Sequence, residues 1–136
     1  KNVRVFLVIR EVELERTNAG LARRQRYVYH DPCELGRGCG IYDQPRNVVK
    51  AMGELVEAGK SGKESICCGG SLGSLTLSFD RRKALTENAL NNLTIASPDT
   101  IITACPLCRS TFNRYADRPV RDIAEMLDEA TMKRKR

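Results

Sequence analysis

Residues 26–33 read Arg-Tyr-Val-Tyr-His-Asp-Pro-Cys, and the architecture of the chain follows from this segment. Residues 26–30 are rich in β-branched and aromatic side chains, which predicts a strand. The Asp-Pro dipeptide ends that strand, because proline has no N–H to donate and holds the preceding residue in an extended conformation. Cys33 therefore lies directly beyond the end of a strand.

Further along the chain, residues 100–104 (Thr-Ile-Ile-Thr-Ala) have the composition of a fully buried parallel strand, and they end at Cys105. A third strand is expected at residues 64–66, leading into Cys67. Helices are expected, from apolar residues at helical spacing, over residues 43–59, 85–93 and 120–127. Strands that alternate with helices predict an α/β fold with a central, mostly parallel sheet and helices on both faces.

The cysteines are grouped along the chain. Five of the six form one ordered pattern, which consists of Cys33, Cys67, Cys68, Cys105 and Cys108. Right-handed crossovers place the carboxyl ends of parallel strands along one edge of the sheet, where ligands of open α/β sheets bind. We therefore expect these five thiols to meet at that edge. Cys39 lies outside the pattern and is expected to be a small hydrophobic bystander.

Several chemistries use cysteines in such a pattern. Thiolates select iron–sulfur clusters, zinc and copper(I), and five of them exceed the four that structural zinc or an ordinary cluster requires. Adjacent side chains on a strand point to opposite faces, so Cys67 and Cys68 need a turn or a larger target to converge. Disulfides remain a further alternative. A thioredoxin-like dithiol at Cys105 and Cys108 is another, but it leaves the other three cysteines of the pattern unexplained.

Composition limits the remaining possibilities. At 136 residues and 41% hydrophobic content, residues 1–136 are expected to form a single domain, with residues 1–25 unassigned. Spaced cysteines and no recognisable signal or membrane-spanning segment predict a cytoplasmic protein. The net charge of +6 is concentrated in local runs such as residues 133–136, which are expected to form a solvated end. Aromatic residues make up 5% and tryptophan is absent, which argues against nucleic acid as a partner, whereas peripheral membrane association is compatible with the charge.

Four segments together resemble a known family, the cysteine-rich CCG domain of heterodisulfide reductases. They are Tyr29–Arg37 (Tyr-His-Asp-Pro-Cys-Glu-Leu-Gly-Arg), Tyr42–Arg46 (Tyr-Asp-Gln-Pro-Arg), Cys67–Gly70 (Cys-Cys-Gly-Gly) and Thr103–Cys108 (Thr-Ala-Cys-Pro-Leu-Cys). The same domain occurs in iron–sulfur subunits of glycolate oxidase and of anaerobic glycerol-3-phosphate dehydrogenase. The resemblance covers roughly Tyr27 to Ala130.

This resemblance implies an iron–sulfur cluster of the 4Fe-4S type held by the five cysteines of the pattern, noncubane in heterodisulfide reductases. It implies a redox module that transfers electrons to a disulfide, or between a flavin dehydrogenase and a quinone or other carrier. The expected partners are a flavin subunit and a ferredoxin-type iron–sulfur protein, with this chain as a subunit or fragment of the oxidoreductase. The alternative is a zinc-stabilised, non-catalytic interaction domain of such a complex.

Three residues near the cysteines have two interpretations each. His30, the only histidine, is either a structural hydrogen-bonding residue at the strand end or a catalytic proton donor near a substrate sulfur. Arg37 is either a loop anchor or a charge that offsets an anionic cluster. Arg46 is expected to cap a helix or to pair locally, without a catalytic role.

Overall fold

The computed structural model describes residues 25–71 and 75–134. The expectations about residues 1–25 fall almost entirely outside this part of the chain, as do the side chains of the basic run at residues 133–136. Among the described residues, no helix is both long enough and apolar enough to span a bilayer.

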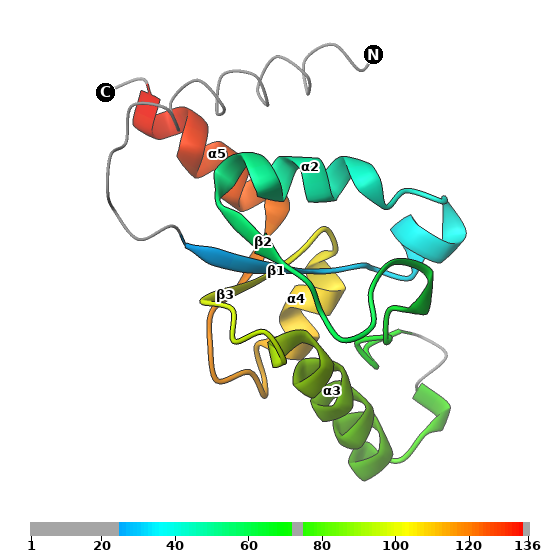
Figure 1. Cartoon of the computed structure of the whole chain (residues 1–136). Helices are drawn as coiled ribbons and strands as arrows, with labels where there is room; N and C mark the ends of the chain where they lie inside the picture. Colours follow the sequence, from blue (N-terminus) through cyan, green and yellow to red (C-terminus); the bar gives the residue numbers. More distant parts are fainter. Residues whose placement is uncertain (1–24, 72–74, 135–136) are drawn as a thin grey trace.

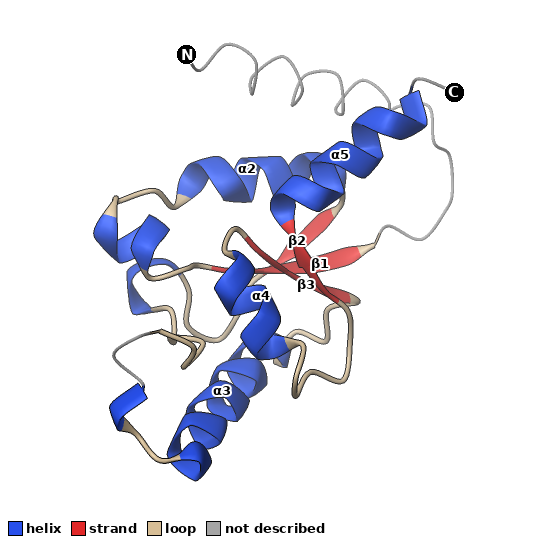
Figure 2. Cartoon of the chain, turned by 180° about the vertical axis from the view of Figure 1, so that it is seen from behind, coloured by secondary structure: helices blue, strands red, loops and turns tan. Residues whose placement is uncertain are grey.

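The described residues form one four-stranded parallel sheet between two layers of helices. Its strands are β1 (Arg26–His30), β2 (Glu54–Val56), β3 (Thr100–Thr103) and β4 (Val120–Asp122), and their order is β2-β1-β3-β4. The longer helices are α2 (Asp43–Met52), α3 (Phe79–Thr94), α4 (Pro106–Phe112) and α5 (Ile123–Arg134). The expected α/β class with helices on both faces is confirmed (Figures 1 and 2).

Alternation along the two central strands creates two hydrophobic layers. On one face, Val28 and Ile101 pack with side chains of α3 and α4, including Phe112. On the other face, Tyr29 and Ile102 pack against α2 and α5. Because consecutive side chains of a strand point to opposite faces, the run at residues 100–103 has to be apolar or satisfied on both sides, and all four residues are buried.

The strand order produces a crevice at the carboxyl edge of the sheet. From β1 the chain passes through α2 to β2 on one side, and then through α3 to β3 on the other side. The connections that leave β1 and β3 therefore diverge, and such a topological switch point is where open α/β sheets bind ligands. Cys33 follows β1 and Cys105 follows β3, so both lie at this switch point.

Gly53 explains why the first helix is shorter than expected. The sequence predicts a helix up to Gly59, but α2 ends at Met52. A Cβ at Gly53 would lie 2.4 Å from the Tyr27 ring and 2.7 Å from the Gln25 carbonyl oxygen. This close approach lets the next residue, Glu54, donate to the same carbonyl at 3.0 Å and begin β2.

Two strand assignments from the sequence also need correction. Residues 64–66 form no strand: Gly62–Glu64 is a single 3-10 turn, followed by an extended loop. Val120, expected in the last helix, belongs instead to β4, and α5 begins at Ile123. In both places the segment is short, so pairing with a neighbouring strand decides the conformation more than side-chain spacing does.

We expect Gly53→Ala to destabilise the domain by about 1–3 kcal/mol, because the added methyl group overlaps a ring and a carbonyl oxygen. Gly38→Ala is the matched control, since its Cβ would make only ordinary contacts of 3.7 and 3.8 Å. Urea denaturation measures both changes. Equal midpoints for the two variants would contradict the close approach at Gly53.

Candidate functional site

Three separate segments bring five cysteines to the carboxyl edge of the sheet. Cys33 precedes a π-helical turn (Glu34–Gly38) that follows β1. Cys105 is the N-cap of α4, and Cys108 lies in the first turn of that helix. Cys67 and Cys68 lie in the extended loop before α3. This last pair reaches the site without a strand of its own, which corrects the expectation that each cysteine group closes a strand.

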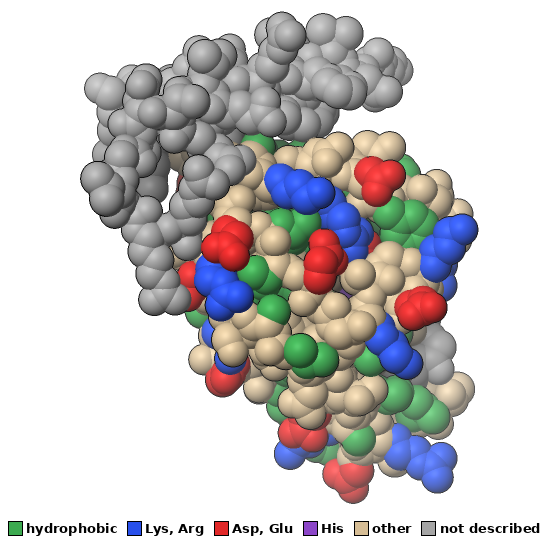
Figure 3. All heavy atoms as spheres, in the orientation of Figure 1, with side chains coloured by type: hydrophobic (Ala, Val, Ile, Leu, Met, Phe, Trp, Pro, Cys, Tyr) green, Lys and Arg blue, Asp and Glu red, His purple; other side chains and the backbone are tan. Residues whose placement is uncertain are grey.

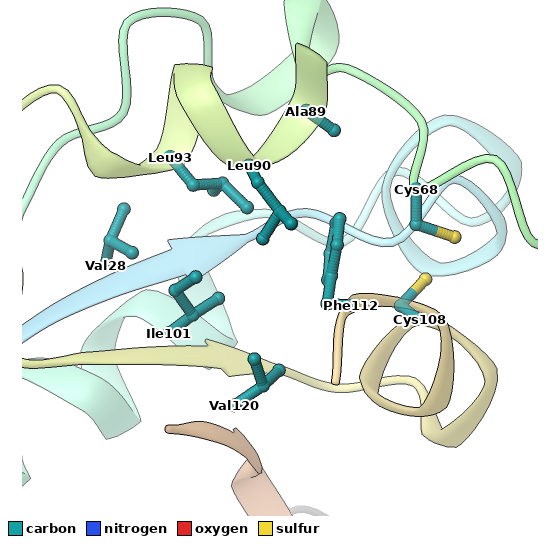
Figure 4. Close-up of a cluster of buried hydrophobic side chains, with 9 residues drawn as sticks. All are labelled: Val28, Cys68, Ala89, Leu90, Leu93, Ile101, Cys108, Phe112 and Val120. Atoms are coloured by element: carbon teal, nitrogen blue, oxygen red, sulfur yellow. The ribbon is translucent and has the colours of Figure 1, made fainter. Parts of the chain in front are cut away.

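The five thiols form a row. The thiol of Cys67 interacts with those of Cys33 and Cys68, and Cys68 in turn interacts with Cys108. The backbone N–H of Cys108 then donates to Cys105 Sγ at 3.5 Å. Figure 4 shows the sulfur atoms of Cys68 and Cys108 pointing toward each other at one end of the hydrophobic layer. We call these five residues, Cys33, Cys67, Cys68, Cys108 and Cys105, the thiol row.

The sixth cysteine and the remaining acidic side chains stay outside the thiol row. Cys39 is exposed, in agreement with its expected role as a bystander, and all six cysteines are free rather than joined in disulfides. Within residues 25–71 and 75–134, no group of three or more His, Cys, Asp or Glu side chains has an arrangement that could hold a metal ion.

Crowding makes the thiols in the middle of the row hard to ionise. Interaction with the neighbouring Cys68 thiol is the largest cause that raises the pKa of Cys67 far above its ordinary value, and burial adds to it. The pKa of Cys68 is raised to about 11, chiefly by the Cys108 thiol. The Gly70 N–H donates to Cys68 Sγ at 3.4 Å, which favours the thiolate in the opposite direction.

Two glycines hold the Cys67–Cys68 loop close to the helices. Gly69 has φ +79°, a conformation that side-chain-bearing residues rarely adopt, and the chain turns there. A Cβ at Gly70 would lie 2.2 Å from Thr111 Oγ1 of α4. The Thr86 hydroxyl of α3 also donates to the Cys68 carbonyl oxygen at 2.8 Å. The turn at Gly69 is what allows two consecutive cysteines to face one site.

Asp31 joins the end of β1 to the segment that leads to the cysteine pair. Its side chain is 2% exposed and forms a bidentate ion pair with Arg46 of α2. The same carboxylate accepts the Gly62 N–H at 2.8 Å, and the backbone carbonyl of Asp31 accepts the Ser65 hydroxyl at 3.2 Å. The expectation that Arg46 pairs locally is confirmed, and its partner precedes it by fifteen residues.

Arg37 anchors a loop. Its guanidinium donates to the Ser65 carbonyl oxygen at 2.8 Å and so connects the π-helical turn after Cys33 with the loop before Cys67. This contact confirms the loop-anchor interpretation.

His30 is a structural residue at the centre of the site. It is 1% exposed, its Nε2 lies 3.1 Å from the Ile66 carbonyl oxygen, and its Nδ1 lies 3.4 Å from Thr103 Oγ1. Its ring meets the Phe112 ring edge-on, with centroids 4.8 Å apart. Burial lowers the pKa of His30 to about 4, so the ring is neutral at physiological pH. The hydrogen-bonding interpretation is thereby confirmed.

Asp31, Ser65 and Thr86 have functions in the site that were not identified from the sequence. Asp31 was interpreted only as a strand terminator, although a carboxylate directly after a buried strand signals that a cation must lie nearby. Ser65 and Thr86 carry no comparable signal. Their hydroxyls act through carbonyl oxygens that are distant in sequence, at Asp31 and Cys68.

The neutral state of His30 predicts a pH dependence of stability. An unfolded histidine has a pKa near 6.5, so the unfolded chain binds more protons than the folded one between pH 6.5 and about 4. The contribution of His30 is therefore complete above pH 6.5 and is lost as the pH falls. We expect wild type to lose about 2 kcal/mol more than His30→Gln between pH 8 and pH 5, by urea denaturation. Parallel pH profiles would show that the ring is not held neutral.

The Asp31 ion pair predicts a non-additive pair of substitutions. Arg46→Met leaves a buried carboxylate without its cation and should destabilise the domain by about 3–5 kcal/mol. Adding Asp31→Asn removes that charge while keeping an oxygen for the Gly62 N–H, so the double variant should be more stable than Arg46→Met alone. Urea or thermal denaturation measures both, and a double variant less stable than the single one would contradict this account.

Comparisons with known proteins agree with this architecture. A 126-residue match to a probable membrane-anchored ferredoxin of Chromohalobacter salexigens is 32% identical and covers 88% of this chain but 19% of the relative. The EtfAB:quinone oxidoreductase of Syntrophomonas wolfei is 36% identical over 91 residues, which is 61% of this chain and 13% of the relative. A subunit of the dihydromethanophenazine:CoB–CoM heterodisulfide reductase of Methanosarcina barkeri is 31% identical over 109 residues, covering 75% and 27%.

The matched region contains the whole thiol row. The profile of the cysteine-rich CCG domain matches residues 27–113, from the second residue of β1 to just beyond the end of α4. The chain spans about a quarter or less of the length of the relatives named above. By this match, its spacing of cysteines and its fold, the chain belongs to the family of cysteine-rich CCG domains.

Proposed function

We propose that this chain is the iron–sulfur domain of a larger oxidoreductase, and that Cys33, Cys67, Cys68, Cys105 and Cys108 hold its cluster. The observation that carries the proposal is the thiol row, in which sulfur atoms from three segments lie next to one another at the switch point of the sheet. A row of five sulfurs suits a centre larger than one ion, because its members lie side by side and each interacts only with its neighbours.

The chemistry of the donors fits such a cluster. Thiolates are the usual ligands of iron–sulfur clusters, and ligand exchange for protons becomes favourable when a cationic centre offsets their mutual repulsion. The raised pKa values of Cys67 and Cys68 reflect that repulsion between the thiols alone. The N–H groups of Gly70 and Cys108, which point at sulfur atoms, are the kind of contact that tunes the reduction potential of a cluster.

Burial differs along the thiol row in a way that suits electron transfer. Cys68 and Cys108 are 2% and 3% exposed and pack into the hydrophobic layer, which excludes water from that side. Cys33, Cys67 and Cys105 are half-buried. A bound cluster takes up and releases electrons one at a time, and the half-buried side would face the donor or acceptor.

The reaction is proposed from the relatives. The relative from S. wolfei is named a quinone oxidoreductase, and that from M. barkeri a heterodisulfide reductase subunit. We propose a 4Fe-4S-type cluster that passes electrons to a disulfide, or from a flavin subunit toward a quinone or ferredoxin-type carrier, within a cytoplasmic complex. Because the chain covers a small part of these relatives, the remaining parts of the oxidoreductase would supply the substrate site.

Anaerobic purification of the chain tests this proposal. We expect about four iron and four acid-labile sulfide per chain, with visible absorption from the thiolate-bound cluster. Cys68→Ser should lose most of that iron, because it removes the buried thiol in the middle of the thiol row. Cys39→Ser is the matched control and should retain the full content, since Cys39 is exposed and outside the row.

Two outcomes would reject the proposal. A colourless protein with one zinc and no sulfide would favour the zinc-stabilised interaction domain instead. Equal iron loss in the Cys39 and Cys68 variants would remove the assignment of the ligands, even if iron were present in wild type.

A further inference from the structure

A second candidate site lies beside the cysteine loop, among residues outside the thiol row. It is a hollow of about 230 Å³ between α3, α4 and the backbone of Gly69 and Gly70. Nothing in the proposed function uses it. In Figure 2 the two helices that flank it lie next to each other below the sheet.

Positive charge dominates the lining of this hollow. Arg82 and Lys83 of α3 and Arg114, just beyond α4, contribute to it, and none of the described lining residues carries a carboxylate. The Nε of Arg82 is buried and has no hydrogen-bond partner among the described residues. A buried guanidinium nitrogen without a partner costs free energy, which an anionic ligand would recover.

The remaining lining is apolar and largely exposed. Phe79 is 62% exposed and Leu107 is 50% exposed, while Tyr115 lies under the Lys83 ammonium at 6.0 Å. Figure 3 shows hydrophobic side chains among the charged ones in the lower part of the molecule, over α3. Cations beside exposed apolar side chains suit a ligand that has both an anionic group and an apolar body.

We infer that this hollow binds a small molecule that carries a carboxylate or phosphate group on an apolar or aromatic body. Its volume is sufficient for a substituted ring, and the hydroxyls of Ser110 and Thr111 add hydrogen-bonding capacity. The Gly70 N–H, at the wall of the hollow, donates to Cys68 Sγ. The ligand therefore lies one residue of backbone away from the thiol row, although its binding requires no cluster.

Titration of the isotope-labelled 136-residue chain by NMR tests the inference. Benzoate is the first probe, phenyl phosphate the second, and benzyl alcohol the neutral analogue. We expect benzoate or phenyl phosphate to shift the amides of Gly69, Gly70 and Thr111 saturably, with a Kd on the order of 1 mM, which is within reach of ligands of this size. The tighter of the two probes identifies the anionic group. Benzyl alcohol should bind at least about tenfold more weakly.

Matched substitutions separate the hollow from general charge effects. Arg82→Gln and Arg114→Gln should each weaken benzoate binding by about tenfold, because each removes a donor to the anion. Arg81→Gln makes the same change in net charge at an exposed neighbouring position that does not line the hollow, and should leave the affinity unchanged.

The inference is overturned if neither anionic probe saturates, if benzyl alcohol binds as tightly as benzoate, or if Arg81→Gln weakens binding as much as Arg114→Gln. These outcomes do not depend on iron content. Failure here would leave the proposed cluster intact, and failure of the cluster would leave this site intact.

Discussion

The buried charge of Asp31 governs how the elements around the site are arranged. A carboxylate that is 2% exposed must have its oxygens satisfied, and the molecule does this with Arg46 from α2 and the backbone N–H of Gly62. Such a pair adds little net stability compared with apolar packing, but it permits few alternative arrangements. It therefore determines where α2 and the loop after β2 lie relative to the end of β1.

His30, the preceding residue, connects the other half of the site. Its ring contacts the Ile66 carbonyl oxygen, Thr103 of β3 and Phe112 of α4. Two consecutive residues at the end of one strand thus hold both cysteine segments that are distant in sequence. Consecutive side chains of a strand point in opposite directions, so His30 and Asp31 can reach different layers of the fold at once.

Gathering five thiols at one place opposes their ionisation, and the fold tolerates this because the thiols can remain protonated. The raised pKa values of Cys67 and Cys68 express the cost of placing negative sulfurs side by side. A positively charged cluster would reverse the sign of that interaction and couple its own binding to the stability of the domain. The glycines next to the pair serve a separate purpose, because they let the backbone approach α3 and α4 closely enough to close the site.

Local composition was enough to predict the α/β class, β1, β3, the approximate positions of α2 and α3, and which five cysteines would lie together. Residues 100–103 are buried and rich in β-branched side chains throughout, and proline follows both Asp31 and Cys105. The short strands β2 and β4, the path of the Cys67–Cys68 loop, and the partners of Asp31 and His30 became known from the folded structure alone. Three-residue strands and buried polar contacts depend on what the neighbouring segment offers, and that neighbour is defined only once the chain has folded.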